Sequence, residues 1–175
     1  MAGYQPVMNL GRLALRLTIG GTFFVHGTQK LFGWFGGYGP DGTGQFFESL
    51  GLRPGRENAL AAGATEAGGG ALIALGLATP LAAAGLSSVM ITALRTAIWN
   101  EGFKTATGEH EVLLAVAALA LTDEENGTGW ALAALGAGAA GSALAISRAR
   151  KQPEAPTAAD PAPASPTVEA PTPSV

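Results

Sequence analysis

The sequence predicts an all-α fold, a bundle of helices that crosses a membrane several times. Three observations support this prediction. Of the 175 residues, 47 % are hydrophobic and only 13 % are charged, whereas roughly 25 % is usual in soluble domains. The apolar residues form five blocks separated by short polar or glycine-rich segments. Between residues 59 and 98 the charged residues are only Glu66 and Arg95, so these blocks have no polar face to meet water.

Each apolar block predicts one helix. The blocks are Leu10 to Phe35, Ala59 to Ala78, Leu81 to Trp99, Val112 to Leu121, and Trp130 to Ile146. The first three reach the ~20 residues that a hydrocarbon core requires. The fourth reaches that length only if residues 108–111 join it, and the fifth is weakly hydrophobic because it is rich in Ala and Gly. A soluble bundle of Ala-rich helices is the alternative, which the missing polar face disfavours.

The two ends of the chain differ in character. No Lys or Arg precedes Arg12, and the first block leads to His26 and Lys30 rather than to a small-residue cleavage site, so we expect a first helix and not an export signal. Residues 152–175 hold most of the eleven prolines and predict a disordered tail. The predicted organisation is a four-helix membrane domain at 1–122, an acidic loop and fifth transmembrane helix at 123–151, and the tail.

The composition excludes several kinds of chemistry. The chain has no cysteine, which excludes disulfides, thiolate metal sites and iron–sulfur ligation, so a redox cofactor must be borrowed. A net charge of −3 without a basic stripe argues against nucleic acid as a partner. Haem would need His26 and His110 to face one buried cavity, and His110 lies at the edge of a block. We therefore predict no metal site.

Polar residues gather at one predicted membrane face. If successive helices alternate in direction, this face holds the end of the first helix, the start of the second, the end of the third and the start of the fourth. Its ionisable residues are His26, Lys30, Glu66, Arg95, Glu109, His110 and Glu111. The opposite face has no comparable set within the spans. Because ionisable groups are costly in a membrane, the cluster predicts a site for substrate binding or proton exchange.

Each member of this cluster also has a simpler interpretation. Lys30 can extend to the interface from the end of its helix. Glu66 and Arg95 can form a structural ion pair between the second and third helices. His26 can be a hydrogen-bonded side chain without a ligand. The acids at positions 109 and 111 can be the solvated start of a helix, where negative charge is favourable. The residues alone leave both interpretations open.

The stretch GWFGGYGPDGTG, residues 33–44, follows the first block. It lacks the GxxxxGK[ST] pattern of a phosphate-binding loop, and no strand precedes it. Trp34, Phe35 and Tyr38 instead predict an aromatic belt at the membrane interface, followed by a turn at Pro40. The next segment, QFFESLGL at residues 45–52, predicts an amphipathic helix that lies flat on the membrane. We expect the whole loop to form a lid over the polar face.

Four segments in this order resemble one known family. They are HGTQKLFGWFGG, FFESLGL, TEAGGGALIALGLATPLAA, and NEGF followed by EHEVLL. Together they resemble the DoxX family over residues 10–122. The resemblance implies a compact four-helix membrane domain of bacterial proteins linked to thiosulfate–quinone chemistry and redox stress. His26, Lys30, Glu66 and Glu111 match recurrent polar positions of the family, whereas Ile98 stands where a His is often found.

Three functional hypotheses follow. The first is a redox-linked subunit of the bacterial plasma membrane, at most one component of a quinone-linked oxidoreductase, which binds a quinone or a small polar substrate at the cluster. The second is a noncatalytic accessory subunit of a respiratory complex, with the small residues at 136–141 packing on helices of partner subunits. The third is a small-solute transporter, which is disfavoured because the sequence shows no internal repeat.

The basic residues predict an orientation in the bilayer. With five spans, most Lys and Arg share the face of the polar cluster, whereas Arg12, Arg16 and the acidic segment at 123–126 share the other face. This distribution favours a cytoplasmic cluster and an external amino terminus. With four spans the tail would change sides.

Overall fold

The computed structural model describes residues 10–101 and 105–151, without the side chains of 97–101 and 105–111. The described residues contain six α-helices and one short 3₁₀ turn and no strand, which confirms the predicted all-α class. The elements are α1 (Leu10–Phe32), η1 (Trp34–Gly36), α2 (Gly39–Ser49), α3 (Gly55–Leu75), α4 (Thr79–Glu101), α5 (Thr105–Asn126) and α6 (Thr128–Lys151). The predicted tail at 152–175 lies outside the described residues.

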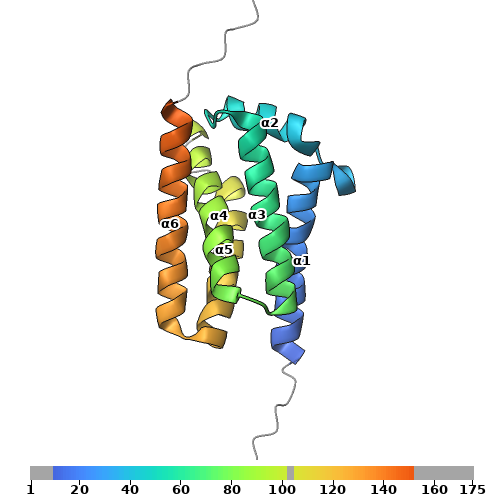
Figure 1. The fold of residues 1–175 in the computed structure, drawn as a ribbon, viewed down its shortest axis with the longest axis vertical. Helices are drawn as coiled ribbons and strands as arrows, with labels where there is room; N and C mark the ends of the chain where they lie inside the picture. The colour runs from blue at the N-terminus through green and yellow to red at the C-terminus, as the bar shows by residue number, and fades with distance from the viewer. Residues whose placement is uncertain (1–9, 102–104, 152–175) are drawn as a thin grey trace, which may run out of the picture.

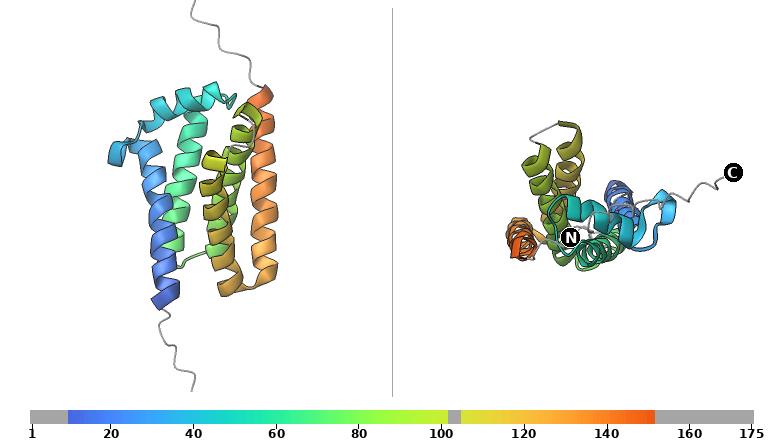
Figure 2. Two further views of the ribbon diagram at one scale, coloured as in Figure 1. Left: turned by 180° about the vertical axis from the view of Figure 1, so that it is seen from behind. Right: turned by 90° about the horizontal axis from the view of Figure 1, so that it is seen from above.

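Five long helices lie side by side along one axis, and α2 crosses one end of them (Figure 1). The helices alternate in direction, so α1 ends, α3 begins, α4 ends, α5 begins and α6 ends at the end covered by α2 (Figure 2). We call this the α2 end and the other the opposite end. All five predicted blocks therefore form helices with the predicted alternation.

The fourth and fifth helices differ most from expectation. Helix α5 begins at Thr105 and has 22 residues, so residues 108–111 do extend the short fourth block. Helix α6 forms from the weakly hydrophobic fifth block. Within the part of the chain that is described, α6 is the one helix long and apolar enough to cross a membrane by length and composition. The sequence analysis expected the opposite, because the fifth block gave the weakest indication of a membrane-spanning helix.

Helices α1 and α3 pack closely through glycines. Gly20 and Gly27 of α1 face Gly70 and Gly63 of α3, so each helix offers two glycines seven residues apart. A Cβ atom at Gly27 would lie 2.6 Å from the carbonyl oxygen of Gly63, and one at Gly20 would lie 2.5 Å from that of Gly70. Side chains at these positions would force the backbones apart. The close approach positions the end of α1 against α3, where Lys30 and Glu66 meet.

Helix α6 packs on α4 of the same chain. A Cβ atom at Gly138 would lie 2.8 Å from the Cβ of Ser87, and the Thr92 hydroxyl donates a hydrogen bond of 3.0 Å to the Ser142 hydroxyl. Gly141 faces Ser88 in the same interface. Of the small residues at 136–141 that were predicted to face partner subunits, Gly138 and Gly141 contact α4 of the same chain, whereas residues 136, 137, 139 and 140 are exposed.

Helix α2 begins earlier than predicted. It covers Gly39–Ser49 rather than residues 45–52, with Pro40 in its first turn. The sequence interpretation placed a loop here because of the glycines at 39, 42 and 44. Pro is favourable at a helix start because it has no N–H to leave unpaired. Gly44 is required by packing, since a Cβ atom there would lie 2.9 Å from the Cα of Arg56 in α3. The segment covers the bundle end as the lid prediction expected.

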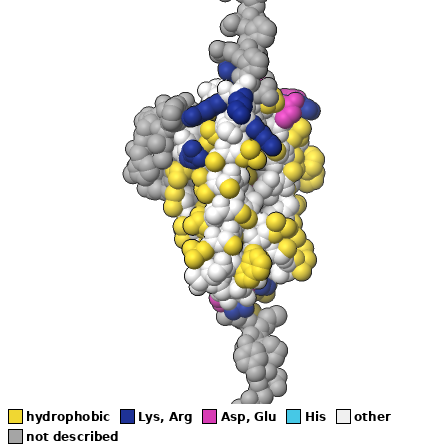
Figure 3. Space-filling view, turned by 60° about the vertical axis from the view of Figure 1, so that its left-hand side comes forward, with side chains coloured by type: hydrophobic (Ala, Val, Ile, Leu, Met, Phe, Trp, Pro, Cys, Tyr) yellow, Lys and Arg dark blue, Asp and Glu magenta, His cyan; other side chains and the backbone are white. Residues whose placement is uncertain are grey.

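Charged and apolar side chains are separated along the bundle. On the face drawn in Figure 3, Lys and Arg side chains lie near the two ends and hydrophobic side chains lie between them. Large exposed hydrophobic residues occur on several helices; they include Phe24, Leu81, Val116, Leu132, Leu135 and Leu144. A soluble bundle would place such residues inside, and a lipid-facing surface requires them outside.

Candidate functional site

The centre of the site is a buried ion pair between α1 and α3. The Nζ atom of Lys30 donates a hydrogen bond of 2.5 Å to Oε2 of Glu66. Glu66 is only 1 % exposed, and the Lys30 side chain is 22 % exposed. A carboxylate is costly to bury without a charged partner. The predicted pairing of Glu66 with Arg95 is wrong, because Lys30 is the partner and Arg95 is exposed on α4.

An open pocket of about 520 Å³ lies beside Lys30, within the volume range of about 300–1,000 Å³ usual for small-molecule sites. We call it the α2 pocket. Its walls are the end of α1, the turn that follows it, and α2. The lining residues are Gln29, Lys30, Gly36, Gly37, Tyr38, Gly42, Thr43, Phe46 and Phe47. Lys30 therefore contacts a buried carboxylate and also lines a pocket.

The turn after α1 is held over Gln29. The Gln29 carbonyl oxygen accepts a hydrogen bond of 3.1 Å from the Gly33 N–H, and Nε2 of Gln29 donates to the Phe35 carbonyl at 3.4 Å. Gly37 must lack a side chain, because a Cβ atom there would lie 2.5 Å from the Gln29 carbonyl oxygen. Phe35 adopts a left-handed conformation with φ of 53°. These contacts form one wall of the α2 pocket.

The predicted aromatic belt points outward from this turn. Trp34, Phe35 and Tyr38 are all exposed, and Tyr38 reaches 86 %. The rings of Phe32 and Trp34 lie 5.0 Å apart, and that of Phe35 meets Trp34 edge-on at 6.5 Å. Tyr38 also lines the α2 pocket, so the mouth of the pocket adjoins the exposed aromatic side chains.

The structure unites only part of the predicted polar cluster. His26 lies one helical turn before Lys30 and is half-buried. Glu109, His110 and Glu111 fall in the first turns of α5, but their side chains are outside the described residues. The residues that line the pocket from α2, Thr43, Phe46 and Phe47, were missed as site residues because their role depends on how α2 folds back. In the described part of the chain, no three His, Asp or Glu side chains lie close enough to hold a metal ion.

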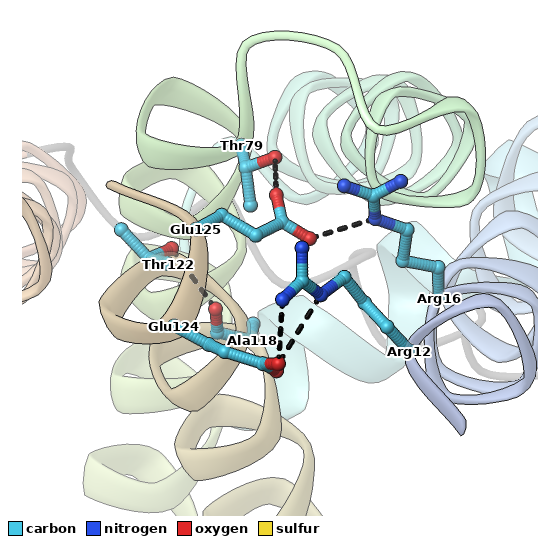
Figure 4. Close-up of polar contacts among 7 residues, drawn as sticks. All are labelled: Arg12, Arg16, Thr79, Ala118, Thr122, Glu124 and Glu125. Carbon is cyan, nitrogen blue, oxygen red and sulfur yellow. Dashed lines mark hydrogen bonds and ion pairs between the residues drawn. The ribbon is translucent and has the colours of Figure 1, made fainter. Parts of the chain in front are cut away.

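A second polar network lies at the opposite end and was not expected (Figure 4). Arg12 contacts Glu124 at 2.8 Å, and Nε of Arg16 donates to Oε1 of Glu125 at 2.7 Å. The Thr79 hydroxyl donates to the other oxygen of Glu125 at 2.8 Å. The expectation of no comparable polar set concerned residues within the spans, and the glutamates of this network lie beyond the fourth apolar block. The available signal was the spacing of two arginines one turn apart in α1 and two adjacent glutamates on the same face.

Glu125 lies beyond the apolar block of α5, level with the turn between α3 and α4. Partial burial favours the neutral acid, but hydrogen bonds from Arg16 and Thr79 and the charges of Arg16 and Arg12 outweigh it, so the pKa of Glu125 is lowered below 4.5. The carboxylate is thus held in its charged form. The network ties α1 to α5 and to the start of α4.

The family model for DoxX matches residues 11–99. The chain belongs to the DoxX family. The matched residues cover nearly all of α1 and most of α4, with η1, α2 and α3 between them, so the Lys30–Glu66 pair and the α2 pocket lie within the DoxX region. Helices α5 and α6 lie outside the match, which ends earlier than the resemblance over residues 10–122 predicted. Comparison with curated proteins and with solved structures finds no match.

Proposed function

We propose that this DoxX-family protein is a five-span membrane subunit of a redox or respiratory complex in the bacterial plasma membrane, and that its α2 pocket binds a quinone or a small polar substrate. The observation that carries the proposal is the position of Lys30, between the buried Glu66 and the open pocket. Membrane proteins place ionisable groups inside the bilayer chiefly where they serve a site.

The dimensions of the bundle support five spans. The five long helices have 21 to 24 residues, and 21 residues at about 1.5 Å each extend about 32 Å, close to the ~30 Å of a hydrocarbon core. Low hydropathy in α3 is explained by its glycines, which are used for contact with α1. The side of a helix that faces lipid can be apolar even when the mean hydropathy of the whole helix is low.

The chemistry of the pocket supports a ligand with hydrogen-bond acceptors and a flat ring. A lysine ammonium has three N–H donors, of which Glu66 accepts one. Gln29 and Thr43 add polar groups, and Phe46, Phe47 and Tyr38 add aromatic surface. The family resemblance supplies the link to quinones and redox chemistry. Because the chain has no cysteine, the electrons must pass through groups carried by a ligand or by partner subunits.

The test is purification of the tagged protein in mild detergent, with mass spectrometry of co-purifying proteins and extracted quinones. We expect redox subunits together with a quinone at about one per chain. In Lys30→Met the amount of co-purified quinone per chain should fall at least about tenfold, because a charge-assisted hydrogen bond is removed. Arg56→Met is the matched control, since Arg56 is basic, pairs with Asp41 at 2.8 Å on the outside and does not line the pocket.

A noncatalytic accessory subunit is the second candidate, because Lys30 and Glu66 neutralise each other as a purely structural pair would. In that case partner subunits co-purify without a small molecule, and Lys30→Met leaves the redox activity of the complex unchanged. Recovery of the wild-type protein alone, with neither partner nor ligand, would contradict both candidates.

A further inference from the structure

We propose that the α2 pocket selects ligands by charge, accepting neutral head groups and rejecting anionic ones, and that the buried Glu66 is the residue that sets this selection. The inference rests on the proposed function, because it requires a ligand in the α2 pocket. It adds a specificity-determining role for a residue that does not itself line the pocket.

The first step is the charge balance of the pocket. Among the described residues that line it, Lys30 is the only one with a charged side chain. Its Nζ atom lies 2.5 Å from Oε2 of Glu66, so the ammonium charge is already matched. The Glu66 side chain is 2 % exposed and is not among the residues that line the pocket. A ligand therefore meets hydrogen-bond donors without meeting a net positive charge.

The second step is the placement of other charges nearby. Asp41 in the first turn of α2 pairs with Arg56 of α3 at 2.8 Å, and both side chains are more than half exposed. Glu48 accepts a hydrogen bond of 3.1 Å from the Gly55 N–H. Neither Asp41 nor Glu48 lines the pocket. His26 lies one turn from Lys30 on α1 and is half-buried.

The third step compares the two classes of ligand. A neutral carbonyl oxygen can accept one of the remaining N–H groups of Lys30 while Glu66 keeps its own hydrogen bond. A carboxylate or phosphate can accept the same N–H groups, but the negative charge of Glu66 repels it at short range. Near a protein surface such repulsion over a few ångströms is worth at least about tenfold in affinity. The aromatic walls favour either ligand equally if both carry the same apolar tail.

The test uses two probes with the same ten-carbon tail, decyl-benzoquinone and decanoate, and the full-length protein in a neutral detergent at pH 8. Binding is measured by calorimetry. We expect the wild type to bind the quinone at least about tenfold more tightly than the carboxylate. Glu66→Gln leaves the ammonium unmatched, so it should raise the affinity for decanoate at least about tenfold relative to the quinone.

Asp41→Asn is the matched control. It removes the same single negative charge, but from an exposed ion pair of α2 that lies outside the pocket lining, and such pairs contribute little to stability. The ratio of the two affinities should match that of the wild type. If Asp41→Asn changed the ratio of the two affinities as much as Glu66→Gln does, the proposal would be overturned, because the net charge of the protein would then explain the selection.

The remaining outcomes separate this proposal from the proposed function. If neither probe binds the wild type, the ligand-binding function fails and the selection falls with it. If both bind and Glu66→Gln leaves their ratio unchanged, the selection alone is overturned. Gel filtration checks folding. If Glu66→Gln does not fold, the double variant Lys30→Gln with Glu66→Gln keeps the pair uncharged and should gain no affinity for decanoate, so a gain there would also overturn the proposal.

Discussion

One buried acid and one partly buried acid show how single residues define the two ends of this bundle. Glu66 at the α2 end has one lysine as its partner, next to a pocket. Glu125 at the opposite end has a guanidinium and a hydroxyl as partners. Burial of an acid requires compensation in both places. The first arrangement leaves donors of Lys30 available to a ligand, whereas the second uses both carboxylate oxygens in contacts between helices.

The Glu125 network predicts a specific loss of stability in acid. The folded-state pKa of Glu125 is lowered, so the network contributes its full stability above the unfolded pKa of 4.5, and this is lost as pH falls through the folded value. The contribution of Glu125 to the melting temperature in detergent should therefore change little between pH 7 and 5.5. Glu125→Gln should lower the melting temperature by about 2–4 °C at pH 7.

The difference in melting temperature between the wild type and Glu125→Gln should become smaller as the pH approaches 3. A difference that stays constant down to pH 3 would contradict the assigned role of the charge. Glu57→Gln is a suitable comparison, since Glu57 is an exposed acid in the first turn of α3 and is not part of the network.

At the scale of elements, the contact of α1 with α3 positions the site. The glycines at 20, 27, 63 and 70 bring the two backbones together. Lys30 follows Gly27 by three residues and Glu66 follows Gly63 by three, so each charged residue lies about one turn beyond a contact glycine. The short distance between Lys30 and Glu66 depends on this close approach.

Gly27→Ala should destabilise the protein and weaken ligand binding together. The added methyl group would lie 2.6 Å from the Gly63 carbonyl oxygen, so α1 and α3 must separate. Overpacking of this kind costs about 1–3 kcal/mol in unfolding free energy. Gly21→Ala is the control, because no atom lies within 4 Å of its added Cβ and alanine favours a helix. Equal melting temperatures for the two variants would show that this contact does not hold the helices together.

Helix α2 shows where sequence patterns fail at the scale of elements. Its glycines predict a loop, and three glycines in an eleven-residue segment are unusual for a helix. Gly44 is explained only by Gly55 and Arg56 of α3, which pass directly against it. Tertiary packing thus outweighs local helix propensity, and α2 forms one wall of the pocket beside Lys30.

For the whole molecule, an odd number of long helices places the two termini of the bundle at opposite ends (Figure 1). Arg12 and Arg16 at the opposite end are paired with glutamates. The exposed arginines and lysine at the end of α6 lie at the α2 end. This asymmetry favours a cytoplasmic α2 end.

The absence of native cysteine allows a direct test of this topology. Single cysteines replace three exposed residues, Gln45 in α2, Thr128 at the start of α6 and Lys151 at its end. In intact cells a membrane-impermeant maleimide should label Thr128→Cys, and it should label the other two only after permeabilisation. Labelling of positions 128 and 151 from the same side would contradict a spanning α6. Labelling of positions 45 and 151 in intact cells, with position 128 unlabelled, would reverse the orientation.

The sequence by itself determined the helical class, the five long helices, their alternation, and the face at which Lys30 and Glu66 lie. These features follow from local apolar periodicity and from counting, which require no knowledge of contacts. The predicted Glu66–Arg95 pair failed because two residues on one face can be on different sides of a bundle. The Arg12 and Arg16 network was missed although its residues had been placed at one end.

Only the tertiary structure decided which charges meet and what surrounds them. The partner of Glu66 depends on how far α1 and α3 approach, which four glycines fix through their lack of side chains. The α2 pocket depends on a segment folding back over α1, and the contacts of Gly138 and Gly141 with α4 depend on how α6 packs. Distances between helices are properties of packing, and a linear pattern of residues does not contain them.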